Sequence, residues 1–206
     1  MIRRYFLIMT GMFGLFACSK PADPPKPSAP PLPKRLPDTG LDVPPDTVRV
    51  AIETSEGQIV LELDGRHAPQ STANFLHYVD THKLDAGTFY RAIRAGDAGF
   101  IQFNSGDRTY PPIPHEPTTQ TGLSHTDGAL STARYAIGTA SNEFTICIGD
   151  MTYLDAGGTA TPDRQGYAVF GHVVSGMEIV KRILRSRITG ENLAKPVVIT
   201  SAHRIA

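Results

Sequence analysis

Proline is distributed unevenly along this chain, and this feature most clearly separates a part that cannot fold from a part that can. Ten of its 17 prolines lie between Pro21 and Pro45, in a stretch that includes three Pro-Pro pairs. Proline lacks a backbone N–H, so such a stretch favours extended polyproline II and cannot bury enough apolar surface to fold. We therefore expect residues 19–46 to form a disordered tether and residues 47–206 to form one folded domain.

The segment before the tether has the pattern of an export signal. Two arginines, Arg3 and Arg4, precede an apolar run over residues 5–16 that is too short to remain as a membrane span. The run ends in Leu-Phe-Ala-Cys, which resembles the lipobox of bacterial lipoproteins and implies lipidation at Cys18. Residues 1–18 are thus predicted to be a lipoprotein signal segment. The anchored domain would face the periplasm, attached to the outer membrane; ordinary signal cleavage, giving a soluble periplasmic protein, is the alternative.

Charge and cysteine content exclude several classes of function. Twenty basic and 20 acidic residues balance to a formal charge of zero, so we expect no nucleic-acid partner. Two cysteines in very different settings cannot form a disulfide framework, and no HExxH or CxxC spacing predicts a metal site. His115 and Glu116 lie among four prolines, which favours a rigid turn over an acid–base pair. We expect no cofactor and a monomer.

Alternating apolar and polar residues indicate a chain rich in β-structure. Residues 48–54 and 57–63 read as a hairpin around a Ser-Glu-Gly turn. Short strand-like segments follow, separated by glycine-rich connections, at residues 88–93, 100–103, 129–133, 144–148, 167–173 and 197–200. Many short strands separated by turns favour a barrel or a sandwich.

Two segments have helical spacing instead. A helix is predicted to begin at Pro69, with an apolar stripe made by Thr72, Phe75, Leu76 and Val79. A second stripe near the C-terminus comprises Met177, Val180, Ile183 and Leu184. A mainly β fold, a closed antiparallel barrel capped by two α-helices, accommodates this order and leaves no exposed sheet edge.

Several separated segments, in the same order, resemble the cyclophilins, a family of peptidyl-prolyl cis-trans isomerases. The match extends from about Val48 to Ile205 and is carried by Phe89-Tyr-Arg-Ala-Ile93, Gly128-Ala-Leu-Ser-Thr-Ala-Arg134, Ala140-Ser-Asn-Glu-Phe-Thr-Ile-Cys147, Tyr153-Leu-Asp155 and Tyr167-Ala-Val-Phe-Gly171. This resemblance implies a cyclophilin-like β-barrel, proline-containing polypeptides as substrates, and isomerisation of X-Pro bonds.

Rotation about an X-Pro bond faces a barrier of about 18–20 kcal/mol and needs no nucleophile or metal to be catalysed. It requires a groove that holds the proline ring and a cation that draws the imide lone pair out of conjugation. Arginine suits the second task because its guanidinium stays charged and has directed donors. By resemblance Arg91 is the catalytic residue; the alternative is a surface ion pair on a strand.

The resemblance also implies a set of substrate-binding residues: Phe100, Gln102, Ala133, Arg134, Thr145, Leu154 and Tyr167. Either Phe100 or Phe103 can supply the aromatic wall, or both belong to the core. Thr145 stands where cyclophilins usually carry a second phenylalanine, and that exchange forfeits about 1.5–3 kcal/mol of apolar burial. Arg134 replaces an asparagine whose backbone pairs with the peptide. Tyr167 replaces a histidine.

The leading hypothesis is therefore an isomerase that assists the folding of exported proteins. Arg91 and Gln102 support it. Thr145, together with an irregular loop expected at residues 94–99, supports the alternative of a catalytically weak module that binds prolyl peptides as a chaperone or scaffold. A structural envelope lipoprotein is a third possibility without a feature of its own in its favour.

Overall fold

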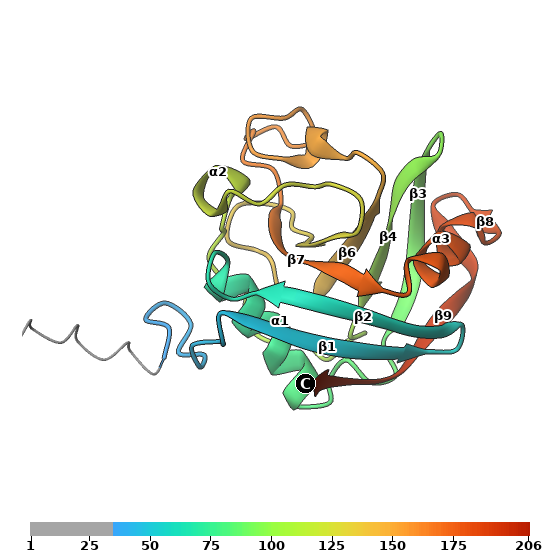
Figure 1. Ribbon diagram of the computed structural model, residues 1–206. Coiled ribbons are helices and arrows are strands. Elements are labelled where there is room, and N and C mark those ends of the chain that lie inside the picture. The colour runs from blue at the N-terminus through green and yellow to red at the C-terminus, as the bar shows by residue number, and fades with distance from the viewer. Residues whose placement is uncertain (1–34) are drawn as a thin grey trace, which may run out of the picture. The chain divides into compact units, whose positions relative to one another are not determined.

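The computed structural model describes residues 35–206, so Cys18, the signal segment and residues 19–34 of the tether lie outside the described residues. Eight antiparallel strands follow one another in the order β1-β2-β7-β5-β6-β4-β3-β9, and β9 pairs with β1 to close a barrel (Figure 1). Their bounds are Thr47–Thr54 (β1), Gly57–Asp64 (β2), Thr88–Ala95 (β3), Ala98–Asn104 (β4), Ala129–Thr132 (β5), Glu143–Ile148 (β6), Ala168–Ser175 (β7) and Asn192–Ile205 (β9). A two-residue strand β8, Ile188–Thr189, forms a hairpin with β9. The predicted closed antiparallel barrel is confirmed.

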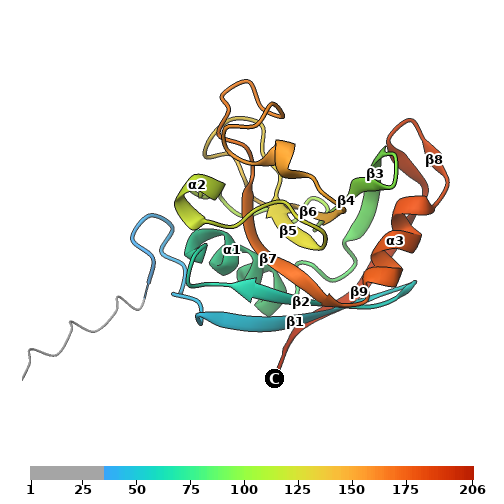
Figure 2. The same ribbon diagram turned by 45° about the horizontal axis from the view of Figure 1, so that its top comes forward.

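The two predicted helices are present and lie at opposite ends of the barrel (Figure 2). They are α1, Pro69–Asp80, and α3, Met177–Arg185. A third helix, the four-residue α2 at Thr118–Thr121, and a single 3₁₀ turn at Thr152–Leu154 were not predicted, because segments this short carry no periodic pattern.

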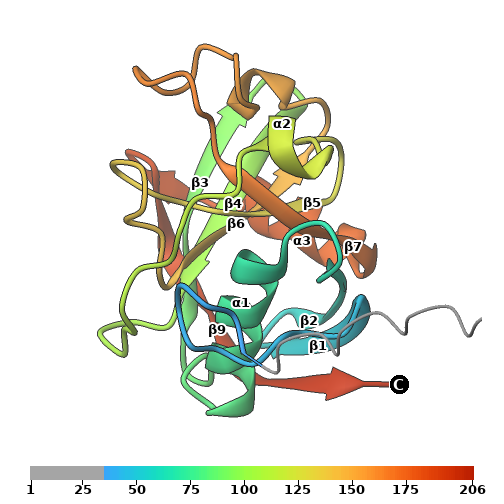
Figure 3. The ribbon, with the colours of Figure 1, turned by 90° about the vertical axis from the view of Figure 1, so that its left-hand side faces the viewer.

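A buried carboxylate from a distant loop caps α1, which Figure 3 shows at the near end of the barrel. Ala68 at the N-cap provides no side-chain bond. Instead Glu116 accepts hydrogen bonds from the Gln70 and Ser71 backbone N–H groups at 2.9 and 2.8 Å, and from the Ser71 hydroxyl at 2.7 Å. Burial raises the pKa of Glu116. Glu116 therefore anchors the loop to the helix; residues 111–117 contain no turn, so the predicted rigid turn is wrong.

The side chains of β4 and β6 point alternately into the barrel core and away from it. Phe103 and Phe144 are fully buried, and the Phe75 ring of α1 meets the Phe144 ring edge-on at 4.9 Å. Because successive strand residues point to opposite faces, Gln102 and Thr145 next to these rings project away from the core. The core thus fixes which residues of β4 and β6 face outward.

The expectation of an irregular loop at residues 94–99 is wrong. Strand β3 continues to Ala95, β4 begins at Ala98, and the two-residue turn between them makes one tight hairpin. Gly99 permits this close pairing: its φ is +154°, and a Cβ there would lie 2.1 Å from the Ile93 carbonyl oxygen. The hairpin sets the register that pairs Arg91 with Gln102.

The last residues of the predicted tether pack on the domain. Arg35 and Asp42 form a β-bridge across a turn, and the Asp46 carbonyl accepts a hydrogen bond from Arg66 N–H at 3.2 Å. Leu36 in this turn is buried. Residues 35–46 therefore contact the domain that the sequence predicted to begin at residue 47. Within residues 35–206, no helix is both long and apolar enough to cross a membrane.

Candidate active site

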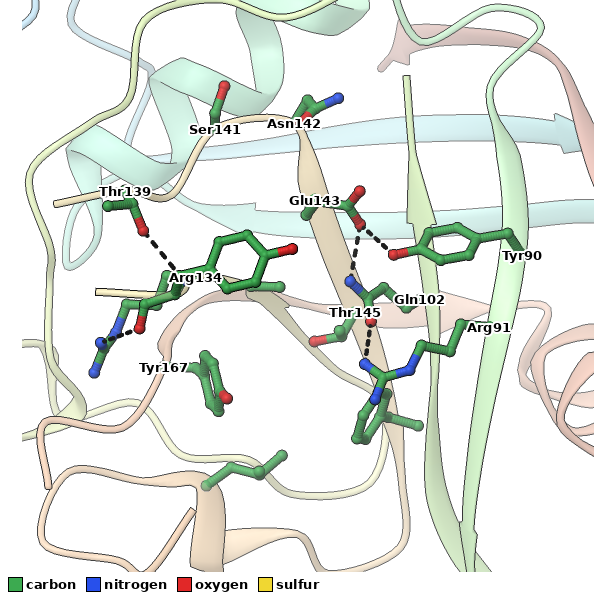
Figure 4. Close-up of a pocket in the computed structure, with 14 residues that line it drawn as sticks. Tyr90, Arg91, Gln102, Arg134, Thr139, Ser141, Asn142, Glu143, Thr145 and Tyr167 are labelled. Atoms are coloured by element: carbon green, nitrogen blue, oxygen red, sulfur yellow. Dashed lines mark hydrogen bonds between the residues drawn. The ribbon is translucent and has the colours of Figure 1, made fainter. Parts of the chain in front are cut away.

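A cavity of about 600 Å³ opens on the outer face of β3, β4 and β6 (Figure 4). All eight residues that the sequence predicted for catalysis and substrate binding line it: Arg91, Phe100, Gln102, Ala133, Arg134, Thr145, Leu154 and Tyr167. Residues from β3 to the loop before β7 therefore meet at one place, although 76 positions separate Arg91 from Tyr167 in the sequence.

Arg91 lies at the edge of this cavity with its guanidinium held on two sides. One terminal nitrogen (Nη1) donates to the Gln102 side-chain oxygen at 2.8 Å. Nε and Nη2 both donate to one carboxylate oxygen of Glu191, at 2.9 and 2.5 Å. The guanidinium carbon lies 5.7 Å from the centre of the Phe100 ring. Three of its five N–H groups are used in this way, which leaves two for a ligand.

Gln102 is oriented from its other end by Glu143. Its amide nitrogen donates to Glu143 at 2.8 Å, so its oxygen must face Arg91. Glu143 also accepts bonds from the Tyr90 hydroxyl at 2.8 Å and from Asn104 at 2.7 Å. Burial raises the pKa of Tyr90, and the hydrogen bond to Glu143 raises it further. A continuous chain of bonds thus connects Tyr90, Glu143, Gln102 and Arg91.

Arg134 contributes to the cavity differently from Arg91. Its side chain is fully buried and donates to the Gly166 carbonyl at 2.9 Å and to both oxygens of Asp163 at 2.8 and 2.9 Å. These bonds hold the pKa of Asp163 well below its usual range. The guanidinium is therefore committed to the loop before β7, which leaves only the Arg134 backbone available for pairing with a peptide.

The apolar wall of the cavity is partly replaced by hydroxyl groups. Thr145 forms a 2.6 Å hydrogen bond with Ser131 and is nearly buried. Phe100, Leu154 and Tyr167 supply the remaining apolar and aromatic lining, whereas Phe103 belongs to the core. The structure thus decides the open choice between Phe100 and Phe103 in favour of Phe100.

Comparison with known proteins agrees with this arrangement. Residues 49–204 match the family model described as cyclophilin type peptidyl-prolyl cis-trans isomerase/CLD. The chain belongs to the cyclophilin family. It is 35% identical over 168 residues to peptidyl-prolyl cis-trans isomerase A of Dickeya dadantii, covering 76% of this chain and 84% of the relative. An isomerase of Streptomyces antibioticus is 34% identical and covers 74% of this chain and 96% of its own length.

A solved cyclophilin has the same fold. The crystal structure of a cyclophilin-type isomerase from Cryptosporidium parvum superposes with a TM-score of 0.66 at 17% identity, covering 78% of this chain and 98% of that one. This cyclophilin is accordingly an enzyme of the peptidyl-prolyl cis-trans isomerase class.

The sequence analysis did not single out six residues that also line the cavity of this cyclophilin: Tyr90, Tyr135, Thr139, Ser141, Asn142 and Glu143. Tyr90 and Glu143 each lie next to residues that were examined, on β3 and β6. Alternation does point to Glu143, which lies two residues before Thr145 on the same face of β6. It gives no signal for Tyr90, because an irregularity between Phe89 and Arg91 interrupts the alternation of β3.

Other chemistry-bearing residues lie away from this cyclophilin's cavity. Cys147 is fully buried, and burial raises the pKa of its thiol to about 12, which disfavours the reactive thiolate. His125 is buried against Asp155, with Nδ1 2.6 Å from a carboxylate oxygen. Across residues 35–206, no group of three or more His, Cys, Asp or Glu side chains is arranged to hold a metal ion.

Proposed function

We propose that this cyclophilin isomerises X-Pro bonds in exported polypeptides as they fold, and that Arg91 assists the rotation. One observation carries the proposal: a guanidinium with two uncommitted N–H groups lies beside an open cavity with aromatic and aliphatic walls. A crystal structure of the related Cryptosporidium parvum isomerase was determined in the presence of the dipeptide Ala-Pro, which fits a proline-containing ligand.

The proposed chemistry is electrostatic. A proline ring enters between Phe100, Leu154 and Tyr167, where apolar contact removes water from the imide bond. Arg91 donates a hydrogen bond to the imide nitrogen as the bond twists, which stabilises the lone pair that leaves conjugation. Gln102 holds the guanidinium in place through its 2.8 Å bond. No covalent intermediate is needed, since only a rotation occurs.

The proposed cellular setting rests on the sequence before residue 35. An export signal that ends at Cys18 supports lipid anchoring on the periplasmic side, at the outer membrane, with the domain acting as a monomer on its tether. Substituting Cys18→Ser and fractionating cells tests this directly. Anchoring predicts that the substitution moves the protein from the membrane to the soluble fraction; an unchanged distribution favours the soluble periplasmic alternative.

A binding module with little turnover remains the second candidate because two observations favour it. Thr145 removes an aromatic ring from the cavity wall, and Glu191 occupies two of the guanidinium donors of Arg91. Both features reduce turnover: Thr145 loosens the hold on the proline ring, and Glu191 competes for the charge that stabilises the twisted bond.

An isomerisation assay on prolyl peptides separates the two candidates. The isomerase hypothesis predicts turnover by the wild-type protein and a loss of about 10²- to 10³-fold in kcat/KM for Arg91→Ala. The matched control is Arg49→Ala, which removes another strand arginine paired with a glutamate at 2.9 Å, away from the cavity. Rates at the uncatalysed level for all three proteins would leave only the binding function.

A further inference from the structure

One carboxylate in the cavity lacks a cationic partner. Glu143 accepts its hydrogen bonds from the Tyr90 hydroxyl and from the side-chain amides of Gln102 and Asn104, all of which are neutral donors. Among the residues that the structure describes, no lysine, arginine or histidine forms an ion pair with it. Its charge is therefore stabilised by hydrogen bonds but is not neutralised.

The other charges around the cavity are already balanced. Arg91 is paired with Glu191 and Arg134 with Asp163. Glu143 lies across Gln102 from Arg91, as Figure 4 shows, so the guanidinium of Arg91 is directed to Gln102 and Glu191 rather than to Glu143. The part of the cavity around Glu143 consequently has a local excess of negative charge.

Two tyrosines border the same part of the cavity. Tyr90 is held by its hydrogen bond to Glu143. The side chain of Tyr135 is exposed, and the backbone N–H of Tyr135 donates to Thr139 at 3.1 Å. Both tyrosines line the cavity together with Glu143. Aromatic rings beside an unneutralised carboxylate attract a lysine or arginine side chain through cation–π and ionic contacts together.

We propose that Glu143, Tyr90 and Tyr135 form a subsite for a lysine or arginine side chain located one to three residues before the substrate proline. This inference rests on the proposed isomerase function and specifies which polypeptides it prefers. The opposite end of the cavity, with Phe100, Leu154 and Tyr167, receives the proline ring, so one substrate can occupy both ends at once.

Paired peptides test the subsite. A series carries Lys, Gln or Glu at each of the three positions before proline, and kcat/KM is measured for wild type, Glu143→Gln and Tyr135→Ala. At one position we expect wild type to favour Lys over Gln by about fivefold and to disfavour Glu by a similar factor. Glu143→Gln brings both ratios close to one. Tyr135→Ala lowers the preference for Lys about twofold.

The controls separate charge from structure. Glu191→Gln removes the other nearby carboxylate and should leave the Lys-to-Gln ratio unchanged. Raising the ionic strength from about 0.02 to 0.5 M should lower the ratio in wild type, because salt screens the contact, and should not affect it in Glu143→Gln. A ratio near one at all three positions in wild type, with normal turnover, overturns the subsite alone.

Absence of turnover with every peptide contradicts the isomerase proposal instead. Calorimetric titration of the same peptides then decides the subsite from their affinities. Tighter binding of the Lys peptide that disappears in Glu143→Gln supports the subsite in a binding module, and equal affinities overturn it.

Discussion

Arg91 and Arg134 line the same cavity, yet 33% of the Arg91 side chain is exposed while that of Arg134 is fully buried. Arg134 uses four of its five N–H groups on fixed acceptors: two backbone carbonyls and both oxygens of Asp163. Arg91 uses three, two of them on a single oxygen of Glu191, whose side chain is 60% exposed. The difference shows that position in a cavity does not define a role. A buried guanidinium with four N–H groups engaged holds a loop, whereas a partly exposed one with two N–H groups uncommitted is available to a ligand.

The largest expected effect is on stability at the buried arginine. Arg134→Ala removes the cation paired with Asp163 and the side-chain donor to the Gly166 carbonyl, and we expect it to lower the free energy of unfolding by about 3 kcal/mol. Arg91→Ala should change that free energy by less than about 0.5 kcal/mol, because exposed ion pairs contribute little. Urea unfolding of both variants measures this. Equal losses would show that the two arginines do not differ as described.

Thr145 lines the same cavity as the two arginines and tests how much the proline pocket contributes to activity. Thr145→Phe restores an aromatic ring to the wall and should raise kcat/KM by about tenfold, mainly through a lower KM. Thr145→Val is the matched control, since it also breaks the bond to Ser131 but does not fill the cavity. If both variants behave alike, the missing ring is not what limits this cyclophilin.

Glu191, the counterion of Arg91, should have a smaller influence on kcat/KM. Glu191→Gln removes the charge that competes for two donors of Arg91, and we expect kcat/KM for neutral peptides to rise about threefold. Wild-type activity should increase with salt as the pair is screened, and this dependence should disappear in the variant. Glu62→Gln, which breaks the Arg49 pair on β1, is the control. A decrease in activity would mean that Glu191 orients Arg91 instead of restraining it.

The counterion of the buried arginine, Asp163, should affect how the fold responds to acid. Arg134 holds the pKa of Asp163 low in the folded state, so the pair stabilises the fold above the unfolded pKa of about 3.9 and this stabilisation is lost as the pH falls toward the lower folded value. We expect Asp163→Asn to shift acid unfolding, followed by circular dichroism, to higher pH by on the order of half a unit. Asp80→Asn, which breaks the exposed pair with Arg204, should shift it less.

The barrel and the eight predicted lining residues followed from the sequence because both depend on local patterns. Alternation defined the inner faces of the strands, and the family motifs carried Arg91 and its neighbours. The β3–β4 hairpin was missed because Arg94 to Gly99 mixes glycine with charged residues and hides the strand alternation. Two functional contacts had no local signal at all. Glu191 reaches Arg91 across 100 positions, and Glu116 reaches Ser71 across 45, so only the folded chain reveals them.

The closure of the barrel has a consequence for synthesis. The first strand, which begins at Thr47, completes its pairing only with the final strand, where Arg49 faces Ile205. Until β9 has left the ribosome, β1 presents an open edge with which any extended segment can pair. Removing residues 199–206 should therefore leave the barrel open between β1 and β3, so the stability of the whole domain depends on a strand made late in synthesis.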